Sequence, residues 1–189
     1  MEFKTLSWKE LNDLALSLAE RIEASGKSYD LIVAAARGGL TLSHILSDTL
    51  SLPITTCTIK SYTTVGVHTL PVVTYPVSET IQGKHVLFVD DLSDSGNTFL
   101  KGIEHLFSKK PASIGTAALF KKPWASFTPD FYIDTTEAWV IFPYDIRETI
   151  EALIKKLTAE GRTFEEIHSL LHSLGMEEAY LEQYLRKIG

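Results

Sequence analysis

Residues 86–99 read VLFVDDLSDSGNTF, and this stretch decides the fold. The apolar run Val86–Val89 predicts a buried strand, and the small polar residues that follow predict a turn that opens a helix. A strand, a turn and a helix in this order are one unit of an α/β sheet, and ligands bind such sheets at the carboxyl ends of the strands. Two adjacent carboxylates, Asp90 and Asp91, stand at that end.

The turn before the helix is suited to an anion, here a phosphate. The first backbone N–H groups of a helix have no partner within it, and the helix dipole favours negative charge beside them. Gly96 permits close approach of the backbone, and the hydroxyls of Ser95 and Thr98 add donors. The residues predicted to line this anion site are Ser95, Gly96, Asn97 and Thr98.

The paired carboxylates have two interpretations. Asp90 and Asp91 are hard oxygen donors that suit the hydroxyls of a ribose, either directly or through Mg²⁺. Alternatively, the segment is a surface loop whose aspartates only cap the helix, because acidic residues are common at helix starts. An apolar strand, three carboxylates and a Gly-Asn-Thr helix entry in one run are much rarer, and they favour the binding site.

Other strands and helices alternate along the first 147 residues. The apolar run 31–36 predicts a second buried strand, which ends at Arg37-Gly38-Gly39 before a helical pattern over 40–50. Residues 61–76 lack a clear period and predict a long loop or ribbon. Further strands are predicted at 53–59, 114–120, 131–133 and 138–142. This alternation predicts an α/β fold with a mainly parallel sheet flanked by helices.

The pattern changes near Arg147, where three helical segments follow one another to the end of the chain. The second begins with the capping box of Thr163 and Glu166. The sequence therefore predicts one domain over residues 1–147 and a C-terminal helical extension over 148–189. The apolar stripes of the extension must be covered, which favours a role in packing or assembly.

Composition restricts the class of protein. The 189 residues carry a formal net charge of −6 with a pI of about 5.5, which argues against a protein that mainly binds nucleic acid. The one cysteine, Cys57, allows no disulfide within the chain and fits a buried strand position, so we expect a reducing compartment, the cytoplasm. The N-terminus has no apolar signal core, and no run reaches the length of a membrane span.

The segment 86–99 resembles the signature of the type I phosphoribosyltransferases, which transfer ribose 5-phosphate from phosphoribosyl pyrophosphate to a nitrogenous base. The usual family pattern has threonine in place of Ser95, which keeps the hydroxyl. The segment Arg37-Gly38-Gly39 resembles the pyrophosphate loop of the family, with a permanent cation and exposed amides. The resemblance implies the type I phosphoribosyltransferase fold with a small hood, and Mg²⁺ as the cofactor.

Two further segments, 120–123 and 137–145, are similar to bacterial xanthine–guanine phosphoribosyltransferases, which act on 6-oxopurines. The resemblance implies that Lys122 donates to the 6-oxo group of the base, that Trp139 stacks on the purine, and that Ile141 also contacts it. Asp145 would then lie near the pyrophosphate and a second metal ion. The implied partners are phosphoribosyl pyrophosphate and a purine base, with neither nucleic acid nor a membrane involved.

Each of these assignments has an alternative. Lys121 competes with Lys122 by register, and either lysine could be a solvated turn residue. Trp139 could be a core aromatic residue, and Asp145 could be a helix cap.

The implied mechanism assigns the proton-accepting role to Asp94, which would accept or share the N7 proton of the base. Ser61 and Tyr62 fall where the mobile loop of the family begins. We also expect a homo-oligomer, a dimer or a tetramer. Two other functions stay open: a regulator that binds phosphoribosyl pyrophosphate without catalysis, and a phosphoribosyltransferase for another base.

Overall fold

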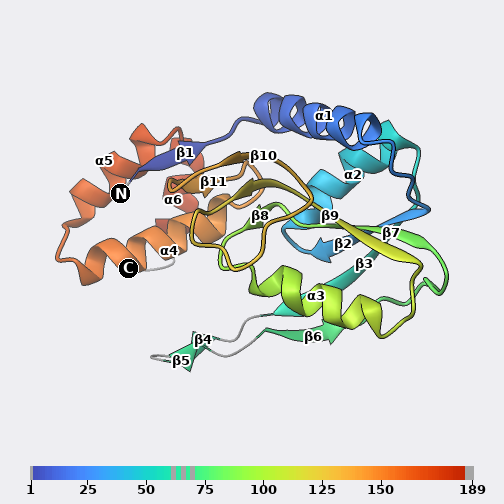
Figure 1. Ribbon diagram of the computed structural model, residues 1–189. Helices are drawn as coiled ribbons and strands as arrows, with labels where there is room; N and C mark the ends of the chain where they lie inside the picture. The colour runs from blue at the N-terminus through green and yellow to red at the C-terminus, as the bar shows by residue number, and fades with distance from the viewer. Residues whose placement is uncertain (1, 61–62, 65–66, 69–70, 186–189) are drawn as a thin grey trace. The chain divides into compact units, whose positions relative to one another are not determined.

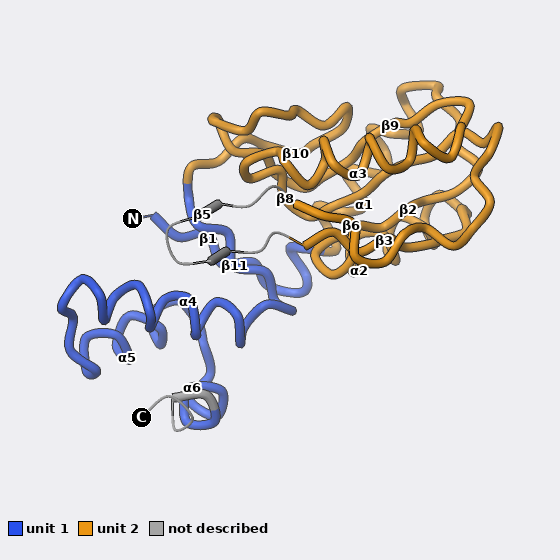
Figure 2. The backbone as a smooth tube through the Cα atoms, turned by 90° about the horizontal axis from the view of Figure 1, so that it is seen from below, with its two compact units in different colours: residues 1–11, 138–189 blue, residues 12–137 orange. Residues whose placement is uncertain are grey.

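A computed structural model describes residues 2–60, 63–64, 67–68 and 71–185. It divides into two compact units, residues 12–137 and residues 1–11 with 138–189, which are described separately (Figure 2). These units differ from the predicted domains, 1–147 and 148–189, and the boundary at residue 147 stays a prediction. No helix among the described residues is long and apolar enough to cross a membrane.

Unit 12–137 is built on a sheet with the order β10-β9-β7-β2-β3-β6, to which β8 adds by pairing with β9. All pairs are parallel except β3 with β6. The strands are β2 (Leu31–Ala36), β3 (Ile54–Lys60), β6 (Val72–Tyr75), β7 (His85–Val89), β8 (Leu92–Ser93), β9 (Ser113–Lys121) and β10 (Phe131–Thr135). The predicted α/β fold with a mainly parallel sheet is confirmed.

Helices cover both faces of this sheet. The helices are α1 (Trp8–Ala24), α2 (Gly39–Leu50) and α3 (Asn97–Phe107). The crossover from β2 to β3 and the crossover from β7 to β9 run in opposite directions along the sheet. Because both crossovers have the same hand, their helices α2 and α3 lie on opposite faces (Figure 1). The strand order therefore reverses between β2 and β7, and such a point is where open α/β sheets bind ligands.

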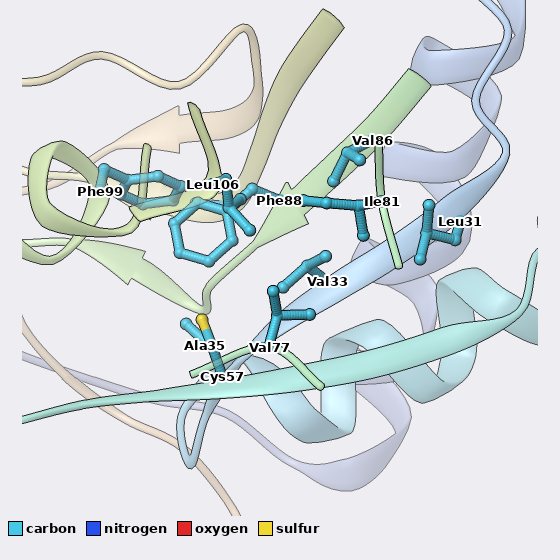
Figure 3. Packing of buried hydrophobic residues seen from close by; sticks show 11 residues of the cluster. Leu31, Val33, Ala35, Cys57, Val77, Ile81, Val86, Phe88, Phe99 and Leu106 are labelled. Carbon is cyan, nitrogen blue, oxygen red and sulfur yellow. The ribbon is translucent and has the colours of Figure 1, made fainter. Parts of the chain in front are cut away.

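The core of this unit lies between α3 and the sheet. Phe88 of β7 meets Phe99 of α3 edge to face, with ring centres 5.6 Å apart (Figure 3). Phe127 stacks on Phe99, with ring centres 5.2 Å apart. Cys57 belongs to the same cluster, and burial followed by the charge of Asp90 raises the pKa of its thiol to about 12. The prediction that Cys57 fills a buried strand position is confirmed.

The segment 61–76 is only partly the loop or ribbon that the sequence predicts. It contains a short antiparallel pair, β4 (Thr63–Thr64) with β5 (Val67–His68), and it ends in β6, which pairs antiparallel with β3. β6 lies at the edge of the sheet, where Val72 and Tyr75 are exposed, and its four residues are too few to show a clear period. The predicted loop residues Ser61 and Tyr62 lie outside the described residues.

The second unit contains the helical tail. Its elements are β1 (Phe3–Thr5), β11 (Trp139–Ile141), α4 (Ile146–Ala159), α5 (Phe164–Ser173) and α6 (Glu178–Leu185). β1 pairs parallel with β11, and the apolar faces of the three helices meet in one core. The capping box of Thr163 and Glu166 starts α5 as predicted, and reciprocal bonds of Ser7 and Glu10 start α1.

His105 of α3 predicts an acid-sensitive contact within unit 12–137. The backbone N–H of Val77 donates to its Nε2 at 3.2 Å, which requires a neutral ring. Burial, and then the charges of Lys109 and Lys101, lower the pKa of His105 below its usual value of 6.5. The unfolded chain therefore binds a proton at His105 more readily than the folded protein does. The contribution of His105 to stability is complete above the pKa that this residue has in the unfolded chain, and it is lost as the pH falls through the lower pKa of the folded protein.

We expect urea unfolding to show a smaller stability loss between about pH 7 and about pH 5 in His105→Gln than in the unchanged protein. The glutamine oxygen can still accept from Val77 but does not titrate in this range. Equal losses in the two proteins would show that His105 does not cause the acid sensitivity.

Candidate active site

The first wall of the candidate site is the turn between β2 and α2. It consists of Arg37, Gly38 and Gly39, and the peptide bond between Ala36 and Arg37 is cis. Arg37 is exposed, and its carbonyl accepts from the backbone N–H of Leu40 at 3.0 Å. The sequence therefore places a permanent cation at the carboxyl end of β2, where the strand order reverses.

The second wall is the turn between β7 and α3, and it packs closely against the first. Since β2 and β7 are parallel neighbours, their carboxyl ends lie at the same edge of the sheet. A Cβ atom on Gly38 would lie 2.6 Å from Oδ2 of Asp91, and one on Gly39 would collide with the carbonyl oxygen of Val89. Gly39 is therefore required by the close approach of the backbone, whereas a side chain at residue 38 would displace the Asp91 carboxylate. The structure brings Gly38, Gly39, Asp90 and Asp91 together.

Asp90 and Asp91 differ in their surroundings. Asp90 is 8% exposed, and burial followed by the charge of Asp91 raises its pKa well above the usual value. Backbone hydrogen bonds from Asp91 and Gly39 partly oppose this rise. The result is a like-charged pair of hard oxygen donors at the sheet edge, which is a suitable site for a divalent cation or for sugar hydroxyls.

The oxygen donors of Asp90 and Asp91 fit a Mg²⁺ ion that takes only some of its ligands from the protein. No cluster of three or more His, Cys, Asp or Glu side chains that could hold a metal occurs among the residues that the structure describes. Mg²⁺ commonly takes one or two carboxylates and completes its shell with water and substrate phosphates. Asp90 and Asp91 match that requirement.

The turn that is predicted to bind an anion lies at the start of α3, and its amides differ from the expectation in one respect. Gly96 is the N-cap residue with φ of 85° and ψ of −10°, and no side chain caps the helix. The N–H of Asn97 is already bonded to Oγ of Ser95 at 3.3 Å, so not all four amides are unpaired as expected. Ser95 and Asn97 are exposed and Thr98 is half-buried, so these side chains reach the surface at the helix end.

The loop 122–127 is bound to the second wall through its backbone. The N–H of Lys122 donates to the carbonyl of Ser93 at 2.9 Å, and the N–H of Ser126 donates to the carbonyl of Ser95 at 2.9 Å. Oγ of Ser93 donates to the carbonyl of Phe127 at 2.8 Å. These bonds hold the predicted base-binding lysine beside the turn that contains Asp94.

Lys122, rather than Lys121, lies with Asp94. Lys122 is 5% exposed; burial lowers its pKa, and the charge of Asp94 partly opposes the shift. Nζ of Lys121 instead lies 5.7 Å from the ring centre of Tyr132. Trp124 contacts both Lys122 and Asp94. Nζ of Lys122 lies 5.6 Å from the ring centre of Trp124, and Nε1 of Trp124 donates to Oδ1 of Asp94 at 3.4 Å. The sequence analysis missed Trp124, although it follows the Lys122-Pro123 pair directly.

The remaining predicted site residues belong to the other unit. Trp139 is half-buried and packs against the helical core, and Ile141 is 2% exposed within that core. Asp145 is the N-cap residue of α4, but its side chain makes no capping bond. The structure does not fix these three residues relative to Asp94 and Lys122.

Comparison with known proteins identifies the family. A family model described as "Phosphoribosyl transferase domain" matches residues 7–148, which is most of the chain. The chain belongs to the phosphoribosyltransferase family.

Several relatives of this phosphoribosyltransferase have purine substrates in their names. A xanthine–guanine phosphoribosyltransferase of Idiomarina loihiensis is 30% identical over 143 residues, covering 75% of this chain and 86% of that protein. The crystal structure of a purine phosphoribosyltransferase from Pyrococcus horikoshii matches with a TM-score of 0.69 and 34% identity, covering 76% and 94% of the two chains. A Neisseria gonorrhoeae protein with bound ppGpp matches with a TM-score of 0.67 and 27% identity, covering 86% and 99%.

Proposed function

We propose that this phosphoribosyltransferase transfers ribose 5-phosphate from phosphoribosyl pyrophosphate to a 6-oxopurine, namely xanthine, guanine or hypoxanthine. The products are the nucleoside monophosphate and pyrophosphate, which makes this a purine-salvage reaction. The main supporting observation is that loop 122–127 holds Lys122 beside Asp94, next to the turn predicted to bind the sugar phosphate. The names of the relatives support the same substrate class.

Each chemical step has a residue suited to it. The C1–O bond to pyrophosphate breaks with its electron pair on the leaving oxygen, and Arg37 and the Gly38-Gly39 amides stabilise that charge. The start of α3 holds the 5-phosphate, and Asp90 and Asp91 hold the ribose hydroxyls. N9 of the purine forms the new bond to C1, while Asp94 accepts the proton that the base gives up. Mg²⁺ bound at Asp90 and Asp91 would supply further neutralisation of the pyrophosphate charge.

The lysine assignment makes a quantitative prediction. We expect Lys122→Gln to raise KM for the preferred 6-oxopurine by about 10- to 100-fold, because a hydrogen bond from a charged group is lost. Lys121→Gln is the matched control, since that neighbouring ammonium lies near the ring of Tyr132. Steady-state kinetics for both substrates checks this. If KM rises in Lys121→Gln instead, Lys121 is the residue that contacts the base.

The assay that tests the whole proposal is direct. The protein is incubated with phosphoribosyl pyrophosphate and, in turn, each of the three 6-oxopurines, orotate and adenine, with and without Mg²⁺, and nucleotide formation is measured. Nucleotide from any 6-oxopurine, dependent on Mg²⁺, supports the proposal. Nucleotide only from orotate or adenine would show a phosphoribosyltransferase for another base. No turnover, together with salt-sensitive DNA binding, would show the non-catalytic regulator.

Four further expectations are proposed alongside the reaction. The protein would act in the cytoplasm, because its single cysteine suits a reducing compartment. It would form a dimer or a tetramer. Asp145 would lie near the pyrophosphate and a second metal ion, and Trp139 would stack on the base.

A further inference from the structure

Trp124 has an unusual environment for a large aromatic side chain. It is 59% exposed, yet its indole contacts two side chains of the proposed site. Its Nε1 donates to Oδ1 of Asp94 at 3.4 Å, and its ring centre lies 5.6 Å from Nζ of Lys122. An exposed indole leaves apolar area in contact with water, and burial of that area under a flat ligand would be favourable.

The backbone fixes where this indole lies. Trp124 occupies a turn in which the N–H of Ala125 donates to the carbonyl of Lys122 at 3.1 Å. Ser126 then bonds the carbonyl of Ser95 twice, through its N–H at 2.9 Å and its Oγ at 2.7 Å. Pro123 directly before it has a fixed φ. The backbone is therefore constrained on both sides of Trp124, by Pro123 before it and by the bonds of Ala125 and Ser126 after it.

The geometry of a purine links these contacts. The 6-oxo group and N7 lie on the same edge of the bicyclic ring, so the groups that bind them must also be neighbours. Asp94 and Lys122, which are proposed to bind these two atoms, are neighbours, and Trp124 contacts both. A base that reaches both residues therefore arrives at the exposed surface of the indole.

We propose that Trp124 is a base-contacting residue that forms an aromatic wall of the base subsite, and that its N–H also orients the Asp94 carboxylate. This inference rests on the proposed function. It adds a residue to which the resemblance assigned no role. The aromatic surface lowers KM for the base, and the N–H supports kcat through Asp94.

Two substitutions separate these contributions. Trp124→Leu removes the ring and the N–H, so KM for the base is expected to rise about 5- to 20-fold while KM for phosphoribosyl pyrophosphate stays unchanged. Trp124→Phe keeps an aromatic ring, so KM for the base stays close to normal and kcat falls about 2- to 10-fold. Trp8→Phe is the matched control because Trp8 is also 59% exposed, and it should change neither value.

Fluorescence gives a readout that does not depend on turnover. The chain has three tryptophans, and the variants Trp8→Phe and Trp8→Phe/Trp124→Phe differ only in Trp124, so the difference between their emissions reports on this residue while Trp139 stays in place. Titration with guanosine monophosphate is expected to change this difference, whereas ribose 5-phosphate alone is not expected to do so.

The outcomes distinguish this inference from the function on which it rests. If the unchanged protein makes nucleotide but Trp124→Leu keeps a normal KM for the base, Trp124 is not a wall of the subsite. An unchanged emission difference during the guanosine monophosphate titration would overturn the inference as well. If the unchanged protein makes no nucleotide with any 6-oxopurine, the proposed function fails first.

Discussion

Asp94→Asn is expected to lower kcat by about 10²- to 10⁴-fold while the protein remains folded, since a positioned general base contributes that much to a rate. The side chain of Asp94 is exposed, so the substitution buries no new polar group. The amide oxygen of asparagine can still accept from Nε1 of Trp124, which preserves the local geometry. KM for phosphoribosyl pyrophosphate should therefore change little.

Asp48→Asn is the matched control, because Asp48 is an exposed aspartate on α2 outside the site. Circular dichroism and thermal unfolding should give the same result for both variants and for the unchanged protein. Single-turnover measurement of nucleotide formation then isolates the chemical step. A rate for Asp94→Asn equal to that of Asp48→Asn would remove Asp94 from the proton-accepting role.

Gly96→Ala is expected to destabilise the protein by roughly 2–4 kcal/mol, because strain from φ and overpacking each cost about 1–3 kcal/mol. The φ of Gly96 is 85°, a region that side chains disfavour, and a Cβ atom would lie 2.5 Å from the backbone N of Phe127. The atom nearest to this Cβ belongs to the backbone and not to the end of a flexible side chain, so the loop 122–127 must move. The amides predicted to bind phosphate would move with it, so KM for phosphoribosyl pyrophosphate should also rise.

Gly83→Ala separates the two causes. Gly83 has a similar φ of 72°, but a Cβ atom there would meet nothing within 4 Å. Its cost is expected to be only about 1 kcal/mol, from the backbone conformation alone. Denaturant unfolding of both variants gives the difference. Equal losses would show that contact with Phe127 does not restrict residue 96.

Sequence predicted the elements that bury long apolar runs or carry caps. The strands β2 and β7 are continuous apolar segments between polar turns, and the two capping boxes have specific residue spacing. Both patterns depend on local chemistry, which one sequence shows directly. The turns that follow β2 and β7 were identified for the same reason.

What sequence could not predict depends on contacts between distant segments. Trp124 gives no periodic signal, and its importance appears only when loop 122–127 pairs with residues 93–96. The edge strand β6 is exposed, and β1 and β8 are only three and two residues long, so none has a clear pattern. The side chain of Ile141 packs in the helical core with residues that are distant in the sequence, a contact that no local pattern predicts.

The pairing of β2 with β7 has a consequence for biosynthesis. The first wall of the site leaves the ribosome about 50 residues before the second, because residues 40–89 separate them in the chain. A nascent chain that ends at Tyr75 already contains Arg37, Gly38 and Gly39 but has no neighbour at the β7 side of β2. Affinity for the sugar-phosphate donor should therefore appear late and abruptly during translation, so the donor cannot stabilise the early folding intermediates.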